Sequence, residues 1–121
     1  MKKSIVIIDD SRTSLQLMKS IIKEDFPNIV IHLFVNSLIA AQNIERLNAD
    51  LYIIDINMPH LNGFDILSSM RSLTAPVYLV SASSEVSLLE KAFSMGASEY
   101  FVKPFNVEKF KLKIKEALFP N

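Results

Sequence analysis

Side chains that can bind a metal ion or a phosphoryl group follow four short apolar runs in this sequence, where each run ends. Two carboxylates, Asp9 and Asp10, follow the first run, and a third, Asp55, follows a later one. A hydroxyl group, Ser81, and an ammonium group, Lys103, follow the last two. Oxygen ligands of this kind suit Mg²⁺, and a carboxylate can accept a phosphoryl group as a nucleophile. These residue types therefore predict a site for a divalent cation beside a phosphoryl group.

The apolar runs themselves have the length and composition of buried parallel strands. They are Ile5–Ile8, Leu51–Ile54, Val77–Val80 and Tyr100–Val102, and a further run begins near Ile29. Their starts recur about every 22 to 26 residues, the length of a strand plus a helical crossover. In an open parallel sheet, ligands bind outside the carboxyl ends of the strands. The polar side chains are therefore expected to meet at one edge of the sheet.

Apolar residues between and after these runs recur at helical spacing, which predicts five helices. The stripes are Leu15, Met18, Ile22 and Phe26; Leu38, Ala41 and Ile44; Phe64, Leu67 and Met70; Val86, Leu89, Ala92 and Phe93; and Phe110, Ile114, Ala117 and Leu118. Ser11 and Asn106 are expected N-caps, and Gly96 is expected to end the fourth helix as its C′ residue. The segment Lys109–Lys115 alternates like a strand, but it follows a cap signal and is predicted to be helical.

Alternating strands and helices predict an α/β fold, a parallel sheet with helices on both faces. A chain of 121 residues fits one domain, over residues 1–121. The chain contains no cysteine, which excludes disulfides and thiolate metal sites. Its formal net charge of zero argues against direct binding to nucleic acid. No apolar stretch approaches the ~20 residues that span a bilayer, so we expect a soluble cytoplasmic protein.

Crowding the three carboxylates into one place has an electrostatic cost. Two such charges about 4 Å apart repel by about 4 kcal/mol at an effective dielectric near 20. A raised pKa, the Lys103 ammonium or a bound cation could offset that repulsion. A lone aspartate after a strand is often only a turn or helix cap. The prediction therefore depends on the complete set of residues rather than on any one of them.

Together, these motifs resemble the receiver domain of bacterial two-component response regulators, and the resemblance covers the whole chain. It is carried by four motifs in order: Asp9-Asp10, Asp55-Ile56-Asn57-Met58-Pro59 with Gly63 after it, Ser81-Ala82, and Lys103-Pro104. The resemblance implies a flavodoxin-like fold with strand order 2-1-3-4-5. It also implies that Asp55 takes a phosphoryl group from a partner histidine kinase or phosphotransfer protein.

The resemblance further implies a role for each site residue. Asp10, Asp55 and the backbone carbonyl of Asn57 would be direct Mg²⁺ ligands, and Asp9 a ligand through water. Lys103 and Ser81 would contact the phosphoryl group, and the peptide bond between Lys103 and Pro104 would be cis.

A conformational switch is also implied by the resemblance. Ser81 would move toward the phosphoryl group, and Tyr100 would turn inward into the vacated space. The fourth helix, fifth strand and fifth helix would then present an altered face to a partner or effector. The chain would be a stand-alone regulator or a receiver excised from a longer one.

Two other functions remain open from the sequence. A phosphatase with an aspartate nucleophile also places it after a parallel strand, but it typically needs a second aspartate two residues later, and that position is Asn57. An interaction module that works without phosphate could use the same fold, although it would not need the full acidic set. We therefore expect a phosphoacceptor signalling domain rather than an enzyme.

Overall fold

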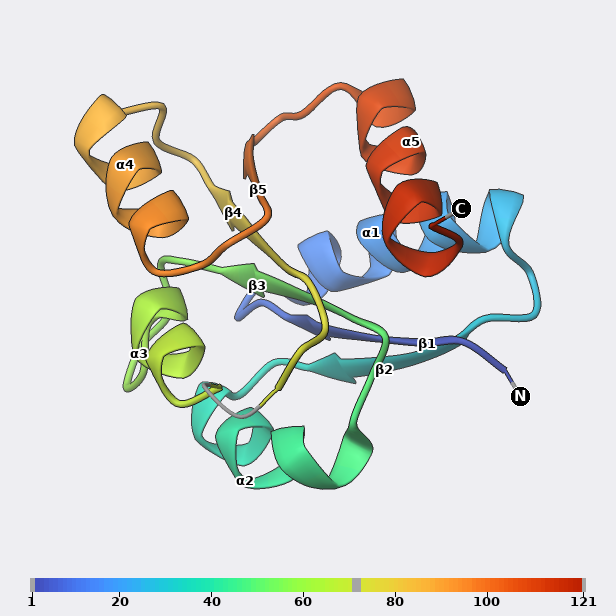
Figure 1. The fold of residues 1–121 in the computed structure, drawn as a ribbon, viewed down its shortest axis with the longest axis horizontal. Helices are drawn as coiled ribbons and strands as arrows, with labels where there is room; N and C mark the ends of the chain where they lie inside the picture. Colours follow the sequence, from blue (N-terminus) through green and yellow to red (C-terminus); the bar gives the residue numbers. More distant parts are fainter. Residues whose placement is uncertain (1, 71–72, 121) are drawn as a thin grey trace.

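The computed structural model describes residues 2–70 and 73–120, and in these ranges five strands form one parallel sheet (Figure 1). They are β1 (Ser4–Ile8), β2 (Val30–Phe34), β3 (Leu51–Asp55), β4 (Val77–Ser81) and β5 (Glu99–Val102). Their order is β2-β1-β3-β4-β5. The sheet confirms the α/β fold predicted from the apolar pattern, and its order confirms the flavodoxin-like arrangement that the resemblance implies.

Five helices connect or follow the strands in the same described ranges: α1 (Arg12–Asp25), α2 (Ser37–Leu47), α3 (Gly63–Ser68), α4 (Val86–Ser94) and α5 (Val107–Leu118). The predicted caps are confirmed, because the side chains of Ser11 and Asn106 accept hydrogen bonds from backbone N–H groups of the helices that follow them. Gly96 has a φ of 99°, as a left-handed C′ residue requires. The segment Lys109–Lys115 is helical. None of the helices described is long and apolar enough to cross a membrane.

The helices form two layers, one on each face of the sheet (Figure 1). Alternate strand residues point to opposite faces, so Ile5 and Ile7 pack with α1 and α5, whereas Val6 and Ile8 pack with α2, α3 and α4. Both faces of the central strands are therefore buried. This double burial explains why the strand sequences are uninterrupted apolar runs rather than alternating ones.

The predicted apolar stripe of α4 is confirmed at Ala92 and wrong at Val86 and Phe93. Val86 is 67% exposed and Phe93 is 49% exposed, whereas Ala92 is buried. Leu88 and Met95 pack with Ala92 against the sheet. The helix carries two apolar stripes at helical spacing, and spacing alone does not say which one faces the core.

Two other helices differ from the predicted stripes in detail. In α2, Leu38 is exposed and Ala40 takes the buried position. The short helix α3 ends before Met70, which is buried beyond the helix end. The stripe of α1 is confirmed, because Phe26, the C-cap, packs partly buried against the same core cluster as Leu15 and Ile22.

Candidate functional site

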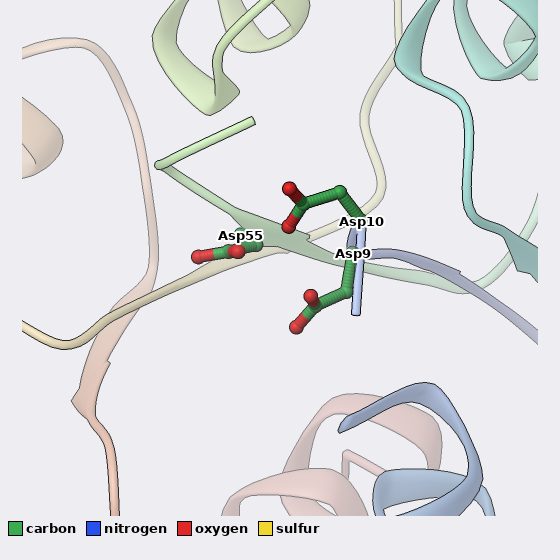
Figure 2. Close-up of side chains that lie close together, drawn as sticks. All are labelled: Asp9, Asp10 and Asp55. Atoms are coloured by element: carbon green, nitrogen blue, oxygen red, sulfur yellow. The ribbon is translucent and has the colours of Figure 1, made fainter. Parts of the chain in front are cut away.

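The register of the central strands brings two of the carboxylates together. Ile8 of β1 pairs with Ile54 of β3, so the next residues, Asp9 and Asp55, are neighbours at the carboxyl ends. With Asp10, each offers one carboxylate oxygen, and these oxygens lie within 4.8 Å of one another. Figure 2 shows the three side chains gathered at the ends of the two strands. The structure therefore forms the acidic cluster that the sequence predicts.

The two aspartates of the acidic pair have different surroundings. Asp9 is fully buried, and both of its oxygens are engaged: Oδ1 accepts the Ser11 N–H at 2.9 Å and Oδ2 accepts the Lys103 ammonium at 2.7 Å. Asp10 is exposed and points to the other side of the strand end (Figure 2). Asp10 therefore has the freer carboxylate of the two.

Lys103 follows β5 and reaches back across the sheet toward β1 and β3. Its Nζ lies 2.7 Å from Asp9 Oδ2 and 3.9 Å from Asp55 Oδ2. It also donates to Ser14 Oγ on α1 at 3.2 Å. The peptide bond between Lys103 and Pro104 is cis, as the resemblance implies. One ammonium group therefore lies between two carboxylates and a hydroxyl.

The surroundings of Asp55 raise the pKa of its carboxyl group. Asp55 is 7% exposed. Burial raises the pKa of Asp55, the charges of Asp9 and Asp10 raise it further, and the Lys103 charge with a backbone N–H at Asn57 lowers it, so that the pKa is about 6. The carboxylate is therefore mostly ionised at neutral pH, and a nearby positive charge would stabilise that form.

Ser81 lies at the end of β4, fully buried. Its Oγ accepts the Ser83 N–H at 3.1 Å and lies 3.5 Å from Asn57 Nδ2. Tyr100 on β5 is half-buried, and its hydroxyl donates to the Ser83 carbonyl at 2.8 Å. A short chain of polar contacts thus joins the loop after Asp55 to Tyr100.

Comparison with known proteins identifies the family. The family model for the response regulator receiver domain matches residues 5–115. The chain belongs to this family. As a receiver domain, it is a phosphoacceptor signalling module of two-component systems rather than an enzyme in the usual sense.

Individual relatives and solved structures agree with the family. The receiver domain is 30% identical over 114 residues to the heme response regulator HssR of Staphylococcus epidermidis, covering 93% of this chain and 50% of that protein. It therefore spans about half the length of the curated relatives it matches. The receiver domain of Francisella response regulator 1452 has a TM-score of 0.88 at 23% identity, with 97% of each chain covered. A CheY-like receiver domain from Methanospirillum hungatei gives 0.87 at 24% identity, covering 98% of this chain and 94% of that one.

Gly63 holds the loop after Asp55 close to the start of α3 in this receiver domain. A Cβ atom at Gly63 would lie 2.7 Å from the Asp55 carbonyl oxygen and 2.9 Å from Ile56 Cα, distances that real Cβ atoms do not tolerate. The Gly63 N–H donates to the Ile56 carbonyl at 3.0 Å. The glycine in the family-like motif therefore has a packing reason, namely the close approach of two backbone segments.

Two serines near the site were missed from the sequence. Ser14 accepts the Lys103 ammonium, and Ser37 is buried, donating to the Pro59 carbonyl at 2.9 Å and accepting the Leu61 N–H at 3.2 Å. Ser37 thereby fastens the loop that follows Asp55 to the start of α2. Ser37 follows a recognisable cap residue, but its partners lie 22 and 24 residues away, so no local signal marks them.

The donor set of the acidic cluster fits a metal ion. It offers carboxylate oxygens from three residues, two of them largely buried, with a single ammonium group between Asp9 and Asp55. Hard oxygen ligands and uncompensated negative charge are what a divalent cation such as Mg²⁺ or Ca²⁺ requires. The cluster is thus consistent with the metal site typical of receiver domains.

Proposed function

We propose that this receiver domain accepts a phosphoryl group on Asp55, with Mg²⁺, from a histidine kinase or a phosphotransfer protein. The observation that carries the proposal is the position of Asp55: a buried carboxylate beside the acidic pair, 3.9 Å from the Lys103 ammonium. Asp55 is mostly ionised above pH 6, because its pKa is about 6. An ionised carboxylate is the form that can attack phosphorus.

In the transfer step, one carboxylate oxygen of Asp55 forms a bond to phosphorus as the bond from phosphorus to the donor's imidazole nitrogen breaks. The electron pair of the broken bond stays on the imidazole, which takes a proton from water. Negative charge is spread over the phosphoryl oxygens during this step. Lys103 supplies a fixed positive charge to these oxygens, and Ser81 supplies a hydroxyl donor.

The occupied oxygens of Asp9 support a division of labour among the proposed metal ligands. Asp10 and Asp55 would bind the metal directly, with the backbone carbonyl of Asn57, while Asp9 would act through water because its two oxygens already accept hydrogen bonds. When bound, Mg²⁺ supplies positive charge that offsets the carboxylates and the transferring group.

We propose that phosphorylation is read on the face formed by α4, β5 and α5. Ser81 and Tyr100 would be the switch residues, since polar contacts join both to Ser83 in the loop after β4. The exposed apolar side chains of Val86, Phe93 and Leu112 on α4 and α5 suit contact with a protein partner or effector domain. We infer no direct contact with nucleic acid or a membrane, and a cytoplasmic location stays a prediction of the sequence.

The test is labelling with small phosphodonors. Acetyl phosphate and phosphoramidate, whose P–N bond is like that of phosphohistidine, are added with Mg²⁺ or with EDTA, and intact-protein mass spectrometry measures the label. We expect Mg²⁺-dependent labelling that disappears in Asp55→Asn. Amide NMR shifts of the labelled protein are expected to change in α4 and β5.

Asp25→Asn is the matched control, because Asp25 is an exposed carboxylate on α1. It should be labelled like the wild type. Full labelling of Asp55→Asn, or equal labelling in EDTA, would reject Asp55 as the phosphoacceptor or Mg²⁺ as the cofactor. Turnover of a phosphomonoester by the wild-type protein would instead support the phosphatase alternative.

A further inference from the structure

The ammonium group of Lys103 is held by two acceptors from one side of the pocket. Asp9 Oδ2 accepts at 2.7 Å, and Ser14 Oγ, in the first turn of α1, accepts at 3.2 Å. Asp9 is itself fixed to the start of α1, because its other oxygen accepts the Ser11 N–H. One acceptor of Lys103 therefore lies just after β1, where its backbone N–H donates to the Phe34 carbonyl of β2, and the other lies in α1.

Two hydrogen-bond acceptors restrict the rotation of a lysine ammonium group more than one acceptor does. An ammonium has three N–H donors on a flexible four-carbon stem. With Asp9 alone, the group could rotate about a single hydrogen bond, whereas Asp9 and Ser14 together leave only one N–H free. Asp55 Oδ2 lies 3.9 Å from Nζ, too far for a hydrogen bond. That gap is where an oxygen of a phosphoryl group on Asp55 would meet the free N–H.

Ser14 has no substitute in its immediate surroundings. It lies with Lys103 along a groove between α1 and the segment after β5, of about 410 Å³. Apart from these two residues, the groove is lined by apolar side chains: Leu17, Met18, Ile21, Pro104, Phe105 and Val107. Of these side chains, only the Met18 thioether can accept a hydrogen bond, and it is a weak acceptor. Loss of the Ser14 hydroxyl would therefore leave that N–H without a strong side-chain acceptor in the groove.

We propose that Ser14 is a positioning residue for phosphoryl transfer: its hydroxyl, with Asp9, directs the ammonium of Lys103 toward the phosphoryl oxygens on Asp55. This inference rests on the proposed function of Asp55. Ser14 does not touch the phosphoryl group and acts through Lys103. Small displacements of a charged group from the reacting atoms lower rates by large factors, up to ~100-fold for about 1 Å. Loosening rather than removing Lys103 should have a smaller effect.

The experiment compares Ser14→Ala, Ser14→Thr and Thr13→Ala with the wild type. Thr13 is exposed in the same helical turn and serves as the matched control. Rates of labelling by acetyl phosphate are measured over a range of donor and Mg²⁺ concentrations. We expect Ser14→Ala to lower the maximal rate about five- to tenfold, with less than about a twofold change in the half-saturating concentrations of donor and Mg²⁺. Ser14→Thr, which keeps the hydroxyl, should recover most of the rate, and Thr13→Ala should not change it.

A second measurement follows Lys103 directly. The ¹⁵N shift of its ammonium nitrogen should move in Ser14→Ala and stay in place in Thr13→Ala, while the urea midpoints show that all variants are folded. Equal maximal rates for Ser14→Ala and the wild type, or an equally slow Ser14→Thr, would overturn the inference. An unchanged ammonium shift in Ser14→Ala would also overturn it. If the wild type itself takes no label, the proposed function of Asp55 fails, and the ammonium shift still tests the contact with Ser14.

Discussion

Helices α5 and α4 flank the same edge strand, but they are anchored very differently. The stripe Phe110, Ile114 and Leu118 of α5 is completely buried. Phe110 stacks on Phe105 with ring centroids 4.5 Å apart and meets Phe101 edge-on at 5.3 Å. Within α4, all of which the structure describes, Ala92 is the one buried residue. Helix α5 therefore has far more apolar contact with the sheet than α4.

The N-caps and the charged contacts of the two helices also differ, and α5 is again the more firmly held. Asn106 caps α5 through its side chain, and Lys111 joins α5 to α1 by an ion pair with Glu24 at 2.7 Å. The N-cap of α4 is Glu85, which makes no side-chain cap bond. A contact of Lys91 over the ring of Phe64, 4.4 Å from its centroid, joins α4 to α3. Such a contact at an exposed site contributes about 0.5–1 kcal/mol.

The site is divided between these two sides of the sheet. Strand alternation turns Asp9 toward the α1 and α5 layer (Figure 2), and Lys103 contacts α1 through Ser14. Tyr100 packs instead with the α2, α3 and α4 layer. Charged groups that must hold a precise geometry thus lie beside the firmly packed helices. The residues proposed to report phosphorylation lie beside α4, which needs less free energy to displace than α5 because fewer of its side chains are buried.

The largest expected effect comes from truncating one aromatic residue on each helix. Phe110→Ala should lower the free energy of unfolding by about 3–5 kcal/mol, because it empties a fully enclosed position. Phe93→Ala on α4 should cost less than about 1 kcal/mol, because that ring is 49% exposed. Urea unfolding followed by far-UV circular dichroism measures both. Similar losses for the two variants would show that α4 is anchored as firmly as α5.

A smaller effect is expected at Asp55, beside Lys103. Asp55→Asn removes a crowded charge, and we expect it to stabilise the metal-free protein at pH 7.5 by about 2–3 kcal/mol, since one pKa unit corresponds to about 1.4 kcal/mol. The pKa of Asp55 is raised from 3.8 to about 6 by burial and by Asp9. The folded state therefore binds this proton more tightly than the unfolded state does.

The sign of the pH dependence follows from that raised pKa. The stability that Asp55 contributes is fully present below about pH 3.8 and is lost as the pH rises through about 6. The difference in free energy of unfolding between Asp55→Asn and the wild type should accordingly grow between pH 4 and pH 7. It should become smaller when Mg²⁺ is added. Asp25→Asn should differ from the wild type by less than about 0.5 kcal/mol throughout, as expected for an exposed ion pair. If the difference in free energy for Asp55→Asn did not depend on pH, the raised pKa of Asp55 would be contradicted.

Much of the fold and the acidic cluster could be predicted because their signals are local. Runs such as Ile5–Ile8 are apolar on both faces, and a polar residue at the end of each run marks the carboxyl edge of a parallel strand. Once the strands are parallel, Asp9 and Asp55 must lie at the same edge. The order of the strands came from the resemblance, because right-handed crossovers leave several orders possible.

What the sequence could not predict depends on contacts between distant segments. Val86 and Phe93 on one stripe are seven residues apart, as are Leu88 and Met95 on the other, so periodicity alone could not identify the buried face of α4. The contact of Ser14 with Lys103 joins residues 89 positions apart. Its geometry exists only after the sheet and α1 have packed together.

The smallest expected effect tests the ends of the two helices. Asn106→Ala removes the hydrogen bond to the Lys109 N–H at 2.9 Å and should lower the free energy of unfolding by about 1 kcal/mol. Glu85→Ala should change it by less than about 0.5 kcal/mol, because no side-chain cap bond is lost there. Urea unfolding of both variants, side by side, measures the difference. If Glu85→Ala were as costly as Asn106→Ala, the start of α4 would be anchored by its N-cap after all, and displacing α4 would no longer be the easiest way to transmit a change at Asp55.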